Sequence, residues 1–227
     1  MTRYRWLSAE WPVSIATLAK RLKAKPFSSQ VRHGFVVDRV RDESLEGRYI
    51  ERIEYKETVT DPFGVELSFE RVEFKKSEFR ISISRPGLEI REAPRSFQGL
   101  MNQLSEVVDF KVSIASESVS VLEWADKIQY LAKRPIIIDS IQINSLSLKE
   151  GVSAKIIVKG EKDVRVACDA LTKGRHYLLE KVQLRFVDNI SNGFIILGSS
   201  GSANLEIDDS SGELLKIVRE GLSFLKN

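Results

Sequence analysis

The sequence predicts an α+β fold of two similar halves, each made of a helix, an antiparallel sheet of about four strands and a second helix, forming a pseudo-twofold body. Three repeated features predict it. An apolar, helix-like stretch closes at Pro26 and another closes at Pro135. About sixty to seventy residues after each proline, a strand pair ends in Leu-Glu-Ile, at 88–90 and again at 205–207. An amphipathic stretch follows each pair, so we place the halves at 1–115 and 116–227.

The first half is expected to begin with a helix over residues 11–25. Pro12 suits a first helical turn, where its missing N–H is not needed. Ile15, Leu18 and Leu22 recur at helical spacing on one face. The proline that follows ends the helix.

Alternating apolar residues then predict antiparallel strands. Residues 61–64 form the turn between two of them, and a change of phase predicts a bulge near Glu70-Arg71. Pro86-Gly87 suits a type II turn, because glycine tolerates a positive φ. A second helix is expected from about Ser96, with apolar residues at helical spacing to Val108. The alternating strand residues are Ile53, Tyr55 and Val59; Val65, Leu67 and Phe69; and Phe79, Ile81 and Ile83.

The second half repeats this order. Ser120 and Glu123 have the spacing of a capping box and start a helix. Residues 164–168 have the apolar character of a strand, and Cys168 within them is expected to be a buried structural thiol. Further strands are expected at 136–148, 153–159, 177–187, 193–197 and 203–207. A final helix is expected to start at Asp208, Asp209 and Ser210 and to carry an apolar stripe from Leu214 to Leu225.

Composition narrows the classes of function. The chain has 227 residues, one cysteine and two histidines, and no motif of paired cysteines or histidines that would indicate a zinc site. We expect no cofactor and no metal, and we favour a non-catalytic protein, although Arg175 and His176 leave an acid–base pair open. The longest apolar runs are far shorter than the about 20 residues of a membrane helix. With no apolar signal segment either, a cytoplasmic protein without membrane attachment is expected.

The N-terminal region is strongly basic. Residues 1–41 contain nine Lys or Arg and two acidic residues. A basic end suggests an acidic partner such as nucleic acid, although a solvated helix face has the same composition. The candidate nucleic-acid-binding residues are Lys20, Arg21, Lys23, Lys25, Arg32 and Arg39.

The strand residues that point away from the predicted helices differ between the halves. In the first half they balance four cations against four acids, which predicts a solvated face with cross-strand ion pairs. In the second half they combine cations with apolar residues, as a protein interface does, unless another segment of the chain covers them. The candidate partner-binding residues are Lys155, Ile157, Lys159, Lys181, Arg185, Val187, Ile195 and Leu197.

The repeated element order resembles the saddle of TATA-binding proteins, but no motif of that family is present. The balanced charge of the first half argues against a DNA-binding saddle, which should be basic on both halves. The sequence therefore favours a non-catalytic binding or adaptor protein, acting as a subunit of a protein assembly or as a homodimer. The alternative is a sequence-nonspecific nucleic-acid-binding protein that uses the basic N-terminal region.

Overall fold

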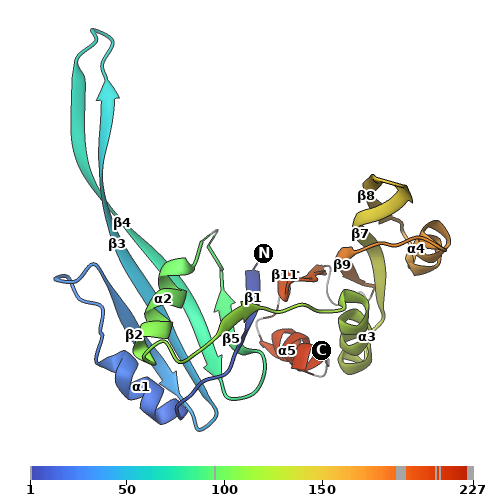
Figure 1. The fold of residues 1–227 in the computed structure, drawn as a ribbon, viewed down its shortest axis with the longest axis horizontal. Helices are drawn as coiled ribbons and strands as arrows, with labels where there is room; N and C mark the ends of the chain where they lie inside the picture. The colour runs from blue at the N-terminus through green and yellow to red at the C-terminus, as the bar shows by residue number, and fades with distance from the viewer. Residues whose placement is uncertain (1, 95, 188–192, 208, 210, 224–227) are drawn as a thin grey trace. The chain divides into compact units, whose positions relative to one another are not determined.

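A computed structural model describes residues 2–94, 96–187, 193–207, 209 and 211–223. These residues form eleven strands of antiparallel sheet and five short helices (Figure 1). The chain divides into two compact units. Unit 2 comprises Glu10–Ile83 and Gly87–Ser113, and unit 1 comprises Met1–Ala9, Ser84–Pro86 and Ile114–Asn227.

Unit 2 is a four-stranded antiparallel sheet with two helices on one face (Figure 1). Phe35, Tyr49 and Phe79 lie on adjacent strands and are buried together, with Phe35 5.3 Å from Tyr49 and 5.9 Å from Phe79 between ring centroids. In sheet order the strands are β2 (His33–Val40), β3 (Ser44–Thr60), β4 (Glu66–Ser82) and β5 (Gly87–Arg91), and the helices are α1 (Ile15–Lys23) and α2 (Gln98–Val107).

Helix α1 begins later than the sequence predicts. Ser14, and not Pro12, precedes its first turn, and the Ser14 hydroxyl accepts a hydrogen bond from the Thr17 N–H. A serine oxygen satisfies a free N–H of the first turn, which a proline at the start does not do. The expected apolar stripe is confirmed, since Ile15, Leu18 and Leu22 are buried. The second predicted helix is also confirmed, as α2.

Unit 1 contains the other seven described strands and three helices. Its core packs Trp6 of the first strand edge-to-face against Trp124 of the first of these helices, 5.6 Å apart between ring centroids. In sheet order the strands are β1 (Thr2–Ala9), β11 (Ser202–Glu206), β10 (Phe194–Gly198), β9 (Leu179–Phe186), β7 (Ile136–Lys149) and β8 (Val152–Lys159). Strand β6 (Ile114–Ser116) pairs with β1, and the helices are α3 (Val121–Ala132), α4 (Arg165–Thr172) and α5 (Glu213–Ser223).

The predicted fold of two helix–sheet–helix halves is wrong. The chain begins with a strand, β1, and this strand pairs with β11 from the far end of the sequence, Thr2 opposite Leu205. Helix α4 interrupts the second series of strands between β8 and β9. The molecule is mostly antiparallel sheet, and its helices do not bracket two equivalent sheets. The proposed boundary near residue 115 stays a prediction.

Three local predictions also need correction. Residues 165–172 form α4 where a strand was expected at 164–168. Ser120 is the N-cap of α3, as expected, but its side chain makes no capping hydrogen bond. No register shift occurs near Glu70-Arg71, so the predicted bulge is wrong. The final helix is present as α5, while the predicted contributions of Asp208, Ser210 and Leu225 lie outside the described residues.

No helix in the described part of the chain is long and apolar enough to cross a membrane.

Candidate interaction surface

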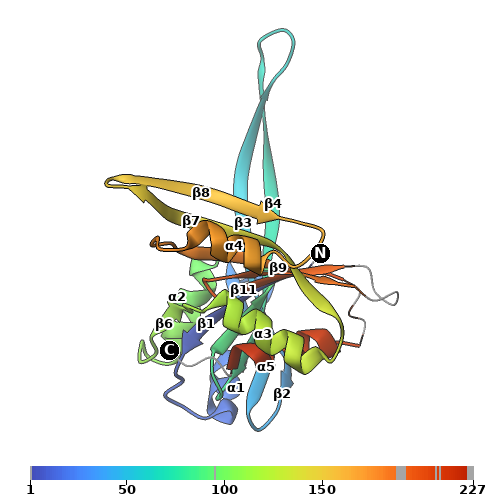
Figure 2. The same cartoon turned by 90° about the vertical axis from the view of Figure 1, so that its right-hand side faces the viewer.

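The most prominent exposed feature of unit 2 is a hairpin, which we call the arm and define as residues 53–75. Strands β3 and β4 have seventeen residues each and pair without a register shift from Ser44 opposite Ser82 to Thr60 opposite Glu66. The neighbouring strands are much shorter. The pairing of β2 with β3 extends outward no farther than Glu51, and the pairing of β5 with β4 extends outward no farther than Glu78. The arm therefore extends as a two-stranded ribbon past the rest of its unit (Figure 1 and Figure 2).

The two faces of the arm differ in polarity. Residues directly opposite each other in an antiparallel pair lie on the same face, and each strand alternates between faces. One face continues outward from the buried Tyr49 and Phe79, and we call it the apolar face. Its apolar members are Ile53, Tyr55, Val59, Leu67 and Phe69, and its charged members are Glu57, Arg71, Glu73 and Lys75. The opposite, polar face carries Glu54, Lys56, Thr58, Thr60, Glu66, Ser68 and Glu70, with Val72 and Phe74 near its base.

The apolar face is uncovered. Tyr55 is 43% exposed, Val59 48%, Leu67 46% and Phe69 53%. Single exposed apolar residues are ordinary, but a contiguous row of them marks an interaction surface. Leu67 lies opposite Val59, and Phe69 is the next residue of β4 on the same face, so this row is contiguous.

The charges on the apolar face neutralise one another. Arg71 forms an ion pair with Glu57 across the two strands, with Nη1 2.8 Å from Oε2. Glu73 and Lys75 complete the set, so this face carries two positive and two negative residues. The arm as a whole has six acidic and three basic residues, a net charge of −3, and the excess negative charge lies on the polar face and at the turn.

The turn at the end of the arm presents an aromatic side chain. One Asp61 carboxylate oxygen accepts hydrogen bonds from the Phe63 N–H at 2.8 Å and from the Val65 N–H at 2.9 Å. Gly64 has φ +86°, which glycine adopts without strain. The turn predicted for residues 61–64 is confirmed, and it holds Phe63 91% exposed.

The six candidate nucleic-acid-binding residues all lie in unit 2. The structure places Lys20, Arg21 and Lys23 in α1, Lys25 just after it, Arg32 before β2 and Arg39 in β2. Within the described ranges, no ion pair involves Lys20, Lys23, Arg32 or Arg39, and all four side chains are exposed.

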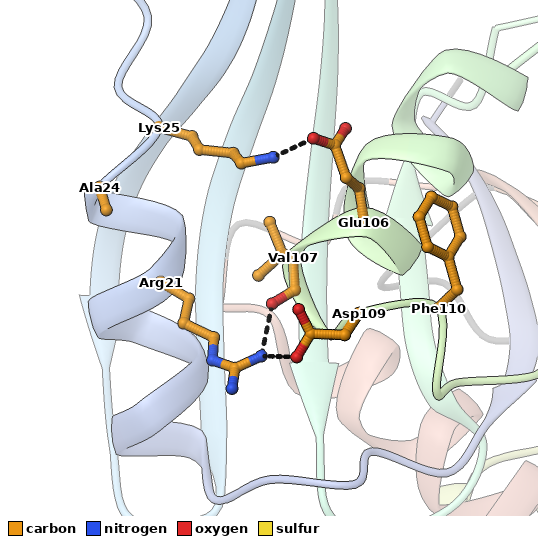
Figure 3. Close-up of a pocket in the computed structure, with 7 residues that line it drawn as sticks. All are labelled: Arg21, Ala24, Lys25, Glu106, Val107, Asp109 and Phe110. Carbon is orange, nitrogen blue, oxygen red and sulfur yellow. Dashed lines mark hydrogen bonds and ion pairs between the residues drawn. The ribbon is translucent and has the colours of Figure 1, made fainter.

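The other two cations are engaged by acidic groups across an open pocket of about 690 Å³ between α1 and α2 (Figure 3). Arg21 donates hydrogen bonds to the Val107 carbonyl at 2.9 Å and to the Asp109 carboxylate at 3.0 Å. Lys25 donates to Glu106 at 2.6 Å, and this hydrogen bond lowers the pKa of the Glu106 carboxyl. A pocket lined by as many acids as bases does not attract phosphate.

The candidate partner-binding residues lie in unit 1, and the structure brings some of them together. Ile157 of β8 lies opposite Gln142 of β7, which in turn lies opposite Lys181 of β9, so three strands contribute to one patch. Ile157 is 55% exposed, Lys155 and Lys159 flank it on the same face, and Val187, after β9, is also exposed.

Ion pairs neutralise most of the cations in this patch. Lys155 lies 2.8 Å from Glu180, and Lys181 lies 3.9 Å from the same carboxylate. Hydrogen bonds from Lys155 and Gln142 lower the pKa of Glu180. Arg185 pairs with Asp139 at 2.9 Å. Among the described residues only Lys159 of the four predicted cations forms no ion pair, so the patch is less basic than the sequence suggested.

The predicted exposure of Ile195 and Leu197 is wrong. Both are fully buried in the core of unit 1, opposite Leu184 and Val182 of β9. They belong to an unbroken apolar run, residues 194–197, in which alternation cannot tell the inner face from the outer one.

The two histidines and the cysteine lie apart in the described structure. His33 and His176 lie in different units, and Cys168 is buried, which raises the pKa of its thiol. No group of three or more His, Cys, Asp or Glu side chains in these residues is placed to hold a metal ion.

The arm is the exposed feature that sequence reasoning missed. Its two strands and its turn were predicted, but its apolar residues were assigned to a core under the helices. A strand of seventeen residues is about 56 Å long, whereas a helix of ten residues covers about 15 Å. Strands much longer than the helices of the same unit were the available signal.

No protein-family model matches the chain, and no curated protein has a significantly similar sequence.

Proposed function

We propose that this protein is a non-catalytic binding subunit or adaptor that contacts a protein partner through the apolar face of the arm. The observation that carries the proposal is the contiguous row of Tyr55, Val59, Leu67 and Phe69, all of which are exposed on the apolar face of the ribbon. A single cysteine that is buried and free agrees with action in the reducing cytoplasm.

Energetics supports a partner on this face. Apolar surface removed from water contributes about 25 cal/mol per Å², so an uncovered row of four large side chains forgoes several kcal/mol of stabilisation, on the order of a hot-spot contact. A two-stranded ribbon is also marginal in water without a further layer. A protein surface supplies both the apolar contact and the layer.

The charge of the arm distinguishes this proposal from nucleic-acid binding. A net charge of −3 repels the phosphate backbone, and two of the six predicted nucleic-acid contacts are engaged by acids. Of the six predicted nucleic-acid-binding residues, only Lys20, Lys23, Arg32 and Arg39 are then left to bind phosphate. Nucleic-acid binding is therefore treated as one of the outcomes of the test.

The test compares the full chain with a shortened-arm variant in which Asn-Gly replaces residues 55–71. Glu54 and Val72 are register partners, so a two-residue turn closes the ribbon between them. Both tagged proteins are recovered from an extract of the native host with and without nuclease. We expect the full chain to retain a protein partner after nuclease treatment and the variant to lose it. Equal recovery by both proteins, or recovery abolished by nuclease, would contradict the proposal.

A further inference from the structure

We infer that the partner of the arm is a second copy of this chain, with the apolar face of one arm packed on the apolar face of the other. This inference rests on the proposed function, because it names the occupant of the same surface. A two-fold dimer uses the same patch on both copies, so the patch must be compatible with itself in charge, shape and area.

Charge compatibility is met by the apolar face and not by the polar face. Two positive and two negative residues balance on the apolar face, and Glu57 and Arg71 already neutralise each other within one copy. Two such faces can approach without net repulsion. The polar face carries three glutamates against Lys56 alone, so two polar faces would bring like charges together.

The second copy also supplies a missing layer. At the base of the arm, α1 and α2 cover the sheet face that contains Tyr49 and Phe79. Farther out, no described helix of unit 2 lies over the same face, although five of its nine residues are apolar. An apolar sheet face is stable when a second layer packs on it, and two sheets pack face to face at about 10 Å. The arm of a second copy is a layer of the same length and the same polarity.

The exposed area is close to what a dimer needs. Tyr55, Val59, Leu67 and Phe69, with Phe63 and Val65 at the turn, expose on the order of 600 Å², since one aromatic side chain alone presents 150–250 Å² when fully exposed. The charged residues of the same face add to this. A stable interface buries about 800 Å² on each partner. A partner that touched only the turn would cover a fraction of that area.

The experiment is sedimentation velocity of the purified full chain over a concentration series from about 1 to 100 μM, a range that brackets the dissociation constants of ordinary dimers. We expect the mass to rise toward twice the 25.8 kDa of one chain. Leu67→Asp places a charge on the apolar face, and Ser68→Asp places the same charge one residue farther on the polar face. Leu67→Asp should raise the dissociation constant at least 100-fold, and Ser68→Asp should change it less than threefold. Both side chains are exposed, so both variants keep the circular dichroism of the native chain.

Photo-crosslinking gives a second measurement of the same contact. A benzophenone maleimide is attached to Leu67→Cys or to Ser68→Cys, and the buried Cys168 does not compete for the reagent. The label at position 67 should capture a second copy, and the label at position 68 should not. A monomer at 100 μM, or equal effects of the two aspartates, would overturn the second copy as partner. If the arm still retained a different protein from host extract, the proposed function would stand alone.

Discussion

Asp163 fixes the start of α4 through both of its carboxylate oxygens. Oδ1 accepts hydrogen bonds from the Arg165 backbone N–H at 3.1 Å and from Arg165 Nε at 2.9 Å. Oδ2 accepts from Arg165 Nη2 at 2.8 Å and from the Ile138 N–H of β7 at 3.3 Å. Partial burial favours the neutral acid, but these donors favour the carboxylate more strongly, and the pKa of Asp163 is lowered.

Asp163→Asn should lower the free energy of unfolding by about 1–2 kcal/mol at neutral pH, because an amide loses one acceptor and the charge that strengthens the other. The unfolded pKa of aspartate is about 3.9. Since the folded pKa is lower, the contribution is present above about pH 4 and is lost as the pH falls through the folded value. Urea unfolding at pH 6 and pH 3 checks this. Asp169→Asn on the same helix is the control, and an equal loss in both variants would contradict the role of Asp163.

Individual residues were predictable where polar and apolar positions alternate. Lys155, Ile157 and Lys159 lie on the exposed face of β8 as the pattern predicts. Ile195 and Leu197 were misplaced because all four residues of their run are apolar. The ion pair of Arg185 with Asp139 joins residues 46 positions apart, so no local sequence pattern predicts it.

At the scale of single elements, the cap of α1 is the clearest test of where a helix starts. Ser14→Ala should lower the free energy of unfolding by about 1 kcal/mol, because the Thr17 N–H loses its acceptor. Ser14→Gly is the matched variant and should cost only a few tenths of a kcal/mol. Chemical unfolding followed by circular dichroism gives both values. If the helix instead began at Pro12, position 14 would lie inside its first turn, and Ser14→Gly would be less stable than Ser14→Ala.

The sequence predicted which helices and strands are present better than it predicted how long they are. Helices α2 and α3 and strands β7 to β11 lie close to the ranges expected from periodicity, because each depends on a local pattern. The reach of β3 and β4 past their helices was not predicted. Periodicity records which residues share a face, but it does not record whether another layer covers that face.

At the scale of the whole molecule, we expect the buried core to determine the free energy of unfolding and the arm to determine the interaction with a partner. Trp6 is 1% exposed and packs between Tyr4 and Trp124, whereas no side chain of residues 55–71 is buried. Trp6→Ala should therefore lower the free energy of unfolding by about 3–5 kcal/mol, and shortening the arm should lower it by less than about 0.5 kcal/mol. Guanidinium unfolding followed by circular dichroism measures both. A large loss on shortening the arm would mean that the ribbon supports the fold of unit 2.

The architecture was the hardest level to predict. The apparent repetition of helix, strands and helix depends on local patterns that do recur. Strand β1 breaks the symmetry, and its pairing of Arg3 with Asn204 joins positions about two hundred residues apart. Tyr4 and Trp6 alternate with Arg3 and Arg5, which is a strand pattern, but the stretch is short and its arginines are equally typical of a basic terminal region.

The pairing of β1 with β11 has a consequence for synthesis on the ribosome. Unit 2 lies within residues 10–113, so all of its strands emerge before most of unit 1 is made. Strand β1 emerges first of all, yet the strand that pairs with its Thr2–Arg5 part, β11, is translated only at residues 202–206. Domains tend to fold as they emerge, and distant pairings form late. Unit 2 is therefore expected to fold during translation. The Leu7–Ala9 end of β1 can pair with β6 once residue 116 is made, but a nascent chain stalled before residue 202 leaves Thr2–Arg5 without β11.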